Sequence, residues 1–370
     1  MKARQVLRAA LPGAALVAAV RPGATRSQRA LGTGALMALW TTAYVKYRRA
    51  GRAETAHEFE LLRASNLEVF SRHYNERVPT IEEEFALWGE FHRHRHEMRY
   101  DLVAREARQY TPVGGTILDI GCGSALVADR LAALDANYVG LDFPAHHIAY
   151  ARKRFVDADH RLRTTFVRAD GEQLPLGAAT VDTVVFSEVI EHLMRPERAV
   201  WEIARVLRPG GVLLMTTNNA SEVPLRSPLS HLFAWIEKAV GADHPALLSR
   251  RPWIWPAPVD PELLPAGTAP MYVPHTHHIQ AETRALFGAA GLTTFEWSTF
   301  EFPPPQAATT AWLERRGEPG QKVVDVIEAV ATRLPGVRRL GCHLFMRARK
   351  DRAPIAPAPP AGLWPGPFSS

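Results

Sequence analysis

Short apolar runs alternate with helical patterns through the middle of the chain. Five runs rich in valine, isoleucine, leucine and threonine stand out: TILDI at 116–120, YVGLD at 138–142, TTFVRAD at 164–170, VDTVVFS at 181–187 and GGVLLMTT at 210–217. Runs of this length and composition are typical of buried strands in a parallel sheet. Because helical patterns separate most of them, the sequence predicts an α/β fold with a doubly wound, mostly parallel, Rossmann-like sheet.

The helical patterns have recognisable limits. Residues 82–110 carry apolar positions at helical spacing and predict a helix that leads into the first strand. Further helices are predicted after Ser124, after Pro144 and from Pro196 to Leu207, where the sequence RPGG ends the pattern.

Composition divides the chain into four parts. Residues 1–53 are basic and apolar, residues 54–99 predict a helical extension, residues 100–350 form the α/β body, and residues 351–370 are a proline-rich tail that we expect to be disordered.

Two cysteines in 370 residues indicate neither a disulfide framework nor a zinc site, and favour a reducing compartment.

The fifth strand is followed by a connection, residues 218–276, that is too long for an ordinary loop. It contains Trp235, Trp253 and Trp255. We expect a helical, aromatic insertion that covers the strand ends as an apolar lid. A partner-binding surface is the alternative, because aromatic residues also mark interfaces.

The basic excess of the chain lies mainly at its N-terminus. Ten basic residues and no acidic residue precede position 53, and the remainder is close to neutral. The apolar stretches 9–20 and 30–45 are each shorter than the ~20 residues that span a bilayer. A cleaved signal, an organelle transit peptide, a membrane anchor within residues 9–45 facing the cytosol, and a pair of packed helices all fit this segment.

Residues at the ends of the predicted strands indicate a ligand site, because ligands of doubly wound sheets bind at the carboxyl ends of the strands. Gly121 and Gly123 follow the first strand, where a ligand can approach the backbone closely. Asp142 ends the second strand, where a carboxylate suits a ribose diol, and Asp170 ends the third, where an acid suits an adenine amino group. Leu126 stands where a dinucleotide-binding fingerprint needs glycine or alanine, which speaks against a nicotinamide dehydrogenase.

These motifs resemble class I S-adenosylmethionine-dependent methyltransferases between about residues 100 and 350. The family's first motif, an acid followed by alternate glycines, is matched by Asp119, Gly121 and Gly123, with Ala125 in place of the third glycine. YVGLDFPAHHIAYAR, VRADGEQLPL and VLRPGGVLLMTTNN resemble the later motifs. The resemblance implies a seven-stranded sheet and a cofactor site for S-adenosylmethionine formed by Asp119, Gly121, Gly123, Asp142, Asp170 and Ser187.

The stretch SEVIEHL after the fourth strand allows two interpretations. Glu188, Glu191 and His192 resemble a metal site of ubiquinone-biosynthesis O-methyltransferases and small-RNA 2′-O-methyltransferases, with His277 or His278 as the fourth ligand and Mg²⁺ as the metal. The same pattern occurs in this class without a metal, where His192 would act as the general base. We favour the metal-free interpretation, because the fourth ligand lies beyond the insertion.

The resemblance implies an enzyme that methylates a small-molecule or lipid-like acceptor at a hydroxyl oxygen. The alternatives are a metal-dependent small-RNA 2′-O-methyltransferase and a non-catalytic, membrane-associated binder of S-adenosylmethionine. The body has no dense basic patch with interleaved aromatic residues, which disfavours nucleic acid. Because S-adenosylmethionine is kept inside cells, we expect the body in the cytoplasm, including the cytosolic face of a membrane. The sequence does not indicate an oligomeric state.

Overall fold

The computed structural model describes most of the α/β body. The described residues are 67–76, 80–88, 90–156, 160–193, 195–219, 257–259, 261–264, 272–273, 280–302, 315–334 and 341–354, together with 25, 27, 278 and 338. All helices and strands named below lie in one compact unit, residues 62–219 with 256–370. The predictions for residues 1–53 fall almost entirely outside the described residues, as do those for most of the insertion and of the tail.

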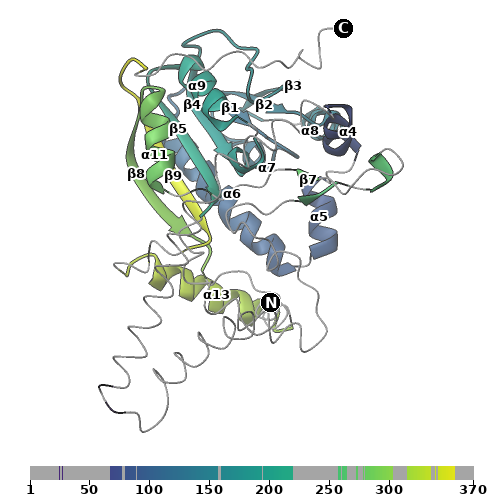
Figure 1. The fold of residues 1–370 in the computed structure, drawn as a ribbon, viewed down its shortest axis with the longest axis vertical. Helices are drawn as coiled ribbons and strands as arrows, with labels where there is room; N and C mark the ends of the chain where they lie inside the picture. Colours follow the sequence, from purple (N-terminus) through teal and green to yellow (C-terminus); the bar gives the residue numbers. More distant parts are fainter. Residues whose placement is uncertain are drawn as a thin grey trace, which may run out of the picture. The chain divides into compact units, whose positions relative to one another are not determined.

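A seven-stranded sheet forms the centre of this unit, with the strand order β3-β2-β1-β4-β5-β9-β8 (Figure 1). Strands β1 to β5 are parallel, and β9 is antiparallel to both of its neighbours. Their bounds are β1 Thr116–Ile120, β2 Asn137–Asp142, β3 Arg163–Arg168, β4 Val181–Ser187, β5 Leu207–Asn218, β8 Leu292–Phe300 and β9 His343–Lys350. The predicted seven-stranded, mostly parallel, Rossmann-like sheet is confirmed.

Helices connect the strands as the sequence indicates. Between β1 and β5 these are α7 Leu126–Arg130, α8 Ala145–Phe155 and α9 Pro196–Val206, with a short 3₁₀ turn, η1 Ile190–His192, directly after β4. Before and after this core lie α4 Leu67–Glu76, α5 Ile81–Trp88, α6 Glu90–Tyr110, α11 Gln280–Ala289 and α13 Glu318–Ala331, with the small elements β6 Ala257–Pro258, η4 Pro261–Leu263 and β7 Tyr272–Val273. The prediction of one leading helix over residues 82–110 is wrong in one respect. This segment belongs to two helices, α5 and α6, which are separated in the sequence by one glycine, a poor helix former.

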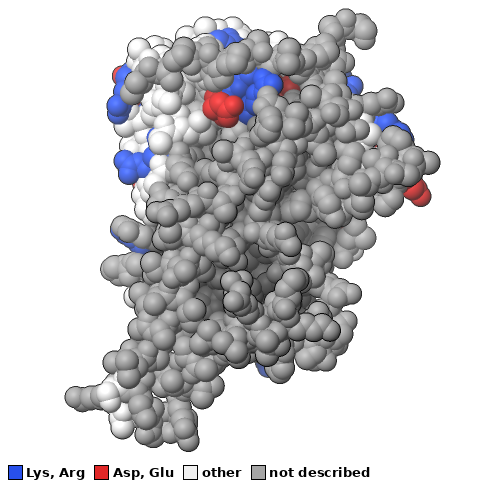
Figure 2. All heavy atoms as spheres, viewed as in Figure 1, with Lys and Arg blue, Asp and Glu red and all other residues white. Residues whose placement is uncertain are grey.

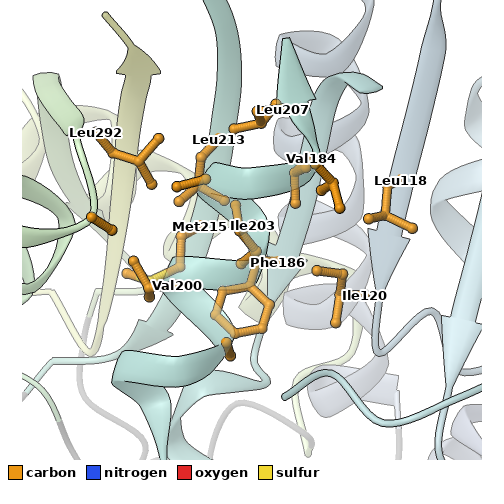
Figure 3. Packing of buried hydrophobic residues seen from close by; sticks show 14 of the residues in the cluster. Leu118, Ile120, Val184, Phe186, Val200, Ile203, Leu207, Leu213, Met215 and Leu292 are labelled. Atoms are coloured by element: carbon orange, nitrogen blue, oxygen red, sulfur yellow. The ribbon is translucent and has the colours of Figure 1, made fainter. Parts of the chain in front are cut away.

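The sheet is buried on both faces, which explains the continuous apolar runs of its strands. On one face, Leu118, Val184 and Leu213 pack with residues of α9 and α11, including Ile203 and Phe287. Figure 3 shows several of these side chains meeting between the sheet and α9. On the other face, α6, α7 and α8 cover a second buried cluster. Because helices pack on both of its faces, the sheet is a rigid support for the loops at its carboxyl edge.

No helix within the described ranges is long and apolar enough to cross a membrane. Residues 9–45, for which a membrane anchor is one of the four alternatives above, lie outside those ranges except for Thr25 and Ser27.

Candidate functional site

The loop after β1 brings the two glycines of the first motif, Gly121 and Gly123, to the carboxyl edge of the sheet. The backbone N–H groups of Gly121 and Cys122 both donate to the carbonyl oxygen of Leu141 in β2, at 2.7 and 3.0 Å. Gly121 has φ +73° and Gly123 has φ +51°, which is the left-handed region that glycine adopts without strain. The loop is thereby fixed to β2 next to the end of that strand.

The two glycines meet different surroundings. A Cβ added to Gly121 would lie 2.3 Å from Cγ2 of Val189, so the loop packs directly against the chain that follows β4. A Cβ added to Gly123 would meet no atom within 4 Å. Gly121 is therefore required by close packing, and Gly123 borders open space that a ligand can enter.

Asp142, at the end of β2, faces this loop. Its Oδ2 accepts a hydrogen bond from the backbone N–H of Gly123 at 2.7 Å, and its Oδ1 accepts one from the N–H of Phe143 at 2.7 Å. His147 of α8 lies 3.3 Å from Oδ2. The carboxylate is partly accessible and keeps further lone pairs, so it can accept hydrogen bonds from the hydroxyl groups of a ribose.

The other predicted cofactor residues lie at the same edge. Asp170 follows β3, and its Oδ1 accepts a hydrogen bond from the N–H of Glu172 at 2.8 Å. Ser187 ends β4, and its Oγ lies 2.8 Å from Oγ1 of Thr216 in β5. The structure thus places Gly121, Gly123, Asp142, Asp170 and Ser187 along one edge, while their contacts with a cofactor stay a prediction.

Asp119 differs from these residues because its side chain is buried within the sheet. The hydroxyl of Tyr138 donates to its Oδ2 at 2.5 Å. Burial raises the pKa of Asp119 to about 7, and the nearby Asp142 carboxylate adds to this, although the Tyr138 hydrogen bond acts in the opposite direction. The Tyr138 hydroxyl therefore holds the Asp119 side chain between β1 and β2, and a contact of Asp119 with a cofactor stays a prediction.

We expect the protonation of Asp119 to make stability depend on pH. In the unfolded chain the Asp119 carboxyl loses its proton near the ordinary pKa of aspartate, and in the folded chain it does so only near pH 7. The folded state therefore loses stability as the pH rises between about 4 and 7. Asp119→Asn should remove on the order of 3 kcal/mol of the decline between pH 4.5 and pH 8, measured as the free energy of unfolding in urea at these two values. The partly exposed Asp135 offers the control, because Asp135→Asn should leave the decline unchanged. Equal declines in Asp119→Asn and the parent protein would contradict the assignment.

The residues predicted as metal ligands are engaged with protein groups instead. Glu191 is buried, and its Oε2 accepts from the Thr217 hydroxyl at 3.0 Å. Its Oε1 lies 3.4 Å from the amide nitrogen of Asn218. Glu188 pairs with His343, with 3.1 Å between Oε2 and Nε2. Within the described residues, no group of three or more His, Cys, Asp and Glu side chains is arranged to hold a metal ion.

The remaining candidates of that set lie at the same edge. His192, the predicted base, ends η1, where its N–H donates to the carbonyl of Val189 at 2.9 Å. His278 is buried beside the end of β5, and its N–H donates to the carbonyl of Asn218 at 3.1 Å. His277 lies outside the described residues. The Mg²⁺ prediction is therefore not supported by the described residues.

A buried charge cluster beside this edge was missed from the sequence. Glu188, Glu301 and His343 meet the α6 residues Arg95 and Arg99. The His343 ring lies between two carboxylates, with 3.1 Å from Nε2 to Glu188 Oε2 and 3.1 Å from Nδ1 to Glu301 Oε2. Burial alone would lower the pKa of His343, but the two carboxylates outweigh it and raise the pKa to about 10. The cluster therefore holds an imidazolium at neutral pH.

The position of these residues in the sequence gave only a weak signal. Glu301 directly follows the apolar run of β8, and His343 opens that of β9, so each is a polar residue at a strand end. Both strands lie beyond the long insertion, and their pairing with the rest of the sheet could not be inferred from the pattern alone.

Comparison with known proteins relates part of the chain to methyltransferases. Residues 118–215 match the methyltransferase domain family. A probable S-adenosylmethionine-dependent methyltransferase of Mycolicibacterium smegmatis is 38% identical over 125 residues, which cover 34% of this chain and 44% of the relative. The ubiquinone biosynthesis O-methyltransferase of Dechloromonas aromatica is 29% identical over 133 residues, 35% of this chain and 52% of the relative. The matched segments thus span about half of these relatives' own length.

Among solved structures, an S-adenosylmethionine-dependent methyltransferase of Methanosarcina mazei is 16% identical, with a TM-score of 0.42 over 65% of this chain and 95% of that one. The strand order with its antiparallel β9, the loop from Gly121 to Gly123 and the family match agree with one another. The chain therefore carries a class I S-adenosylmethionine-dependent methyltransferase domain.

Proposed function

We propose that the domain transfers the methyl group of S-adenosylmethionine to a hydroxyl oxygen of a small-molecule or lipid-like acceptor. The observation that carries the proposal is the pairing of the Asp142 carboxylate with the N–H of Gly123 beside open space. This arrangement fits the cofactor, since the carboxylate can accept from a ribose diol and the glycine leaves room for the chain attached to it. When bound, the cofactor supplies a methyl group that is already activated by its sulfonium.

The protein's part in this chemistry is to bind, align and remove a proton. The glycine loop and Asp142 hold the cofactor in one place, and the rigid sheet keeps the residues after β4 beside it. Alignment of two reactants in this way can supply ~7–11 kcal/mol of a barrier. We propose His192, at the end of η1, as the group that receives the proton of the methylated hydroxyl, because imidazole titrates near neutral pH.

Two observations support a small or lipid-like acceptor. Relatives of this chain include enzymes named for ubiquinone biosynthesis and a demethylmenaquinone methyltransferase of Clavibacter sepedonicus, 33% identical over 119 residues, which are 32% of this chain and 47% of that relative. Among the described residues on the face drawn in Figure 2, the Lys and Arg side chains lie in separate small groups, some of them beside acidic side chains. These described residues do not form the continuous basic surface that nucleic acid binding requires. We place the domain in the cytoplasm, where its cofactor is made.

Calorimetry with S-adenosylhomocysteine and with NAD tests the proposal. We expect the full-length protein to bind S-adenosylhomocysteine and not NAD. Asp142→Ala should weaken that binding about ten- to a hundredfold, because each hydrogen bond to a charged acceptor is worth about 1.5–3 kcal/mol. Asp135→Ala, which changes an aspartate at the opposite edge of the sheet, should bind like the parent. Binding of NAD instead, or unchanged affinity in Asp142→Ala, would refute the proposed cofactor site.

A further inference from the structure

Helix α13 exposes an apolar face in addition to the face that it buries. Gly320, Val324 and Ala331 of this helix are buried. Five other positions carry large apolar side chains that are 37–63% exposed: Val323, Val326, Ile327, Val330 and Leu334. The last of these still belongs to a helical turn, since the N–H of Leu334 donates to the carbonyl of Ala331 at 3.3 Å. Spacings of three and four residues place all five on one side of the helix, and we call this set the α13 stripe.

Exposed apolar side chains are concentrated in this stripe. Nine large apolar side chains are exposed in the described part of the chain, and five of the nine form the α13 stripe. Single exposed apolar side chains are ordinary on a protein surface, whereas a contiguous group of them indicates an interaction site. The stripe therefore indicates an occupant that removes these side chains from water.

The exposed charge around the stripe is mainly positive. Five exposed basic residues lie in α13 or directly beside it: Arg315, Arg316, Lys322, Arg333 and Arg338. Lys322 and Arg333 border the stripe, because each lies one helical turn from one of its members. The exposed acidic residues described in this segment are Glu318, which pairs with Lys322 at 2.7 Å, and Asp325, which pairs with His94 at 2.9 Å. The surroundings of the stripe thus complement an anionic surface.

Glu328 fixes α13 to the edge of the sheet at which the candidate site lies. Its two carboxylate oxygens accept hydrogen bonds from the backbone N–H groups of Glu301 and Phe302, at 3.1 and 2.8 Å. These two residues directly follow β8, and the end of β8 pairs with the start of β9, which pairs with the carboxyl end of β5. The stripe is therefore carried at the same edge of the sheet as the cofactor loop.

The size of the stripe distinguishes between a second copy of the chain and a lipid surface. Residues 318–334 span about 25 Å of a helix about 10 Å wide, so two copies packed through this face alone would bury roughly 500 Å². This area is well below the ~1,200 Å² that a stable, specific interface needs. A lipid surface has no such requirement, because an amphipathic helix lies in its plane with apolar side chains among the acyl chains and basic side chains at the headgroups.

We propose that the α13 stripe docks the domain on the surface of a bilayer that contains anionic lipids. The stripe enters the acyl region, and Lys322 and Arg333 lie at the level of the headgroups. This docking goes beyond the methyl transfer and does not depend on it, because no residue of the cofactor loop belongs to the stripe. It brings the carboxyl edge of the sheet close to the bilayer, from which a lipid-like acceptor of the proposed reaction would enter.

A fluorophore on the stripe tests the docking in the full-length protein. The environment-sensitive fluorophore NBD is attached to Val326→Cys and, in a matched variant, to Ala329→Cys, which is exposed on the polar side of the same helix. Both natural cysteines are buried, so the introduced thiol is the one that reacts. Vesicles of phosphatidylcholine and phosphatidylglycerol in equal amounts should shift the emission of NBD at position 326 to the blue and leave that at position 329 nearly unchanged. Vesicles of phosphatidylcholine alone should bind about tenfold more weakly, since each basic residue near an anionic surface contributes ~1 kcal/mol.

Cosedimentation of unlabelled variants with the same vesicles gives a second measurement. Val326→Asp should lower the affinity for the mixed vesicles about thirtyfold or more, because a carboxylate replaces an apolar group that is placed among acyl chains. Ala329→Asp adds the same charge on the polar side and should lower the affinity no more than about fivefold. Both positions are exposed, and urea denaturation verifies that the variants fold like the parent.

Three results would overturn the docking surface. They are NBD at position 326 that does not respond to vesicles, unchanged affinity in Val326→Asp, and NBD emission that is already shifted to the blue without vesicles. The last result would show that protein covers the stripe, and its dependence on protein concentration would identify a second copy of the chain. None of these measurements uses the cofactor, so failure of the parent to bind S-adenosylhomocysteine would refute the proposed function and leave the docking surface standing.

Discussion

Replacing Glu301 with alanine is expected to lower the free energy of unfolding by about 3–5 kcal/mol, the cost of breaking a buried ion pair from one side. The Glu301 carboxylate is 5% exposed and lies in contact with Arg95 and His343, with Arg99 at 3.9 Å. Its removal leaves the buried Arg95 guanidinium without its main counter-charge, and it leaves Arg99 and the His343 imidazolium with Glu188 as their remaining carboxylate neighbour. Urea denaturation at pH 7 measures the change.

A surface glutamate provides the comparison for this variant. Glu296 lies in β8, the strand that Glu301 directly follows; it is 57% exposed and pairs with Arg347 at 3.5 Å. Because the carboxylate is exposed and Arg347 keeps its 2.7 Å ion pair with Glu106, Glu296→Ala should change the free energy of unfolding by no more than about 1 kcal/mol. A loss of less than about 1 kcal/mol in Glu301→Ala would show that the cluster does not depend on this carboxylate.

Gly121→Ala is expected to reduce the affinity for S-adenosylhomocysteine about a hundredfold. The new Cβ would lie 2.3 Å from Cγ2 of Val189, and alanine would be strained at φ +73°. Strain of about 1–2 kcal/mol and overpacking of about 1–3 kcal/mol force the loop out of its place. A shift of this kind separates the Gly123 N–H from Asp142, and calorimetry measures the consequence.

Gly210 separates the effect of backbone conformation from the effect of packing. It has φ +82° at the start of β5, and a Cβ there would meet no atom within 4 Å. Gly210→Ala should cost some stability and leave the affinity for S-adenosylhomocysteine unchanged. Equal losses of affinity in both variants would mean that Gly121 acts through general stability and not through the loop.

The sequence predicted the central strands well, because their physical requirements are local. The limits of β1 and β4 agree with the apolar runs TILDI and VDTVVFS, since strands that are buried on both faces admit few polar residues. Asp142 ends β2 and Gly123 follows the neighbouring parallel strand β1, so the sequence indicates that the two residues lie close together. In the structure the backbone nitrogen of Gly123 lies 2.7 Å from Oδ2 of Asp142.

The charge cluster could not be predicted in the same way. Glu301 and His343 are 42 residues apart in the sequence, and their partners Arg95 and Arg99 lie some 200 residues before them. Their encounter depends on the antiparallel pairing of β9 with β5 and β8, which no local pattern specifies. For the same reason, the sequence could group Glu188 only with its neighbours Glu191 and His192, as in the metal-site interpretation, whereas its ion-pair partner is His343.

Ala125 has a consequence for the energetics of cofactor capture. It takes the place of a glycine yet adopts the left-handed conformation, with φ 59° and ψ 36°. Alanine in this conformation costs roughly 1–2 kcal/mol that glycine would not, so the packing of the loop holds Ala125 against its own backbone preference. Such strain lowers the free energy needed to open the ligand-free loop, and a bound cofactor that holds the loop closed offsets it. Relative to a loop with glycine at 125, we expect faster exchange of the amide protons of residues 121–125 in the ligand-free protein.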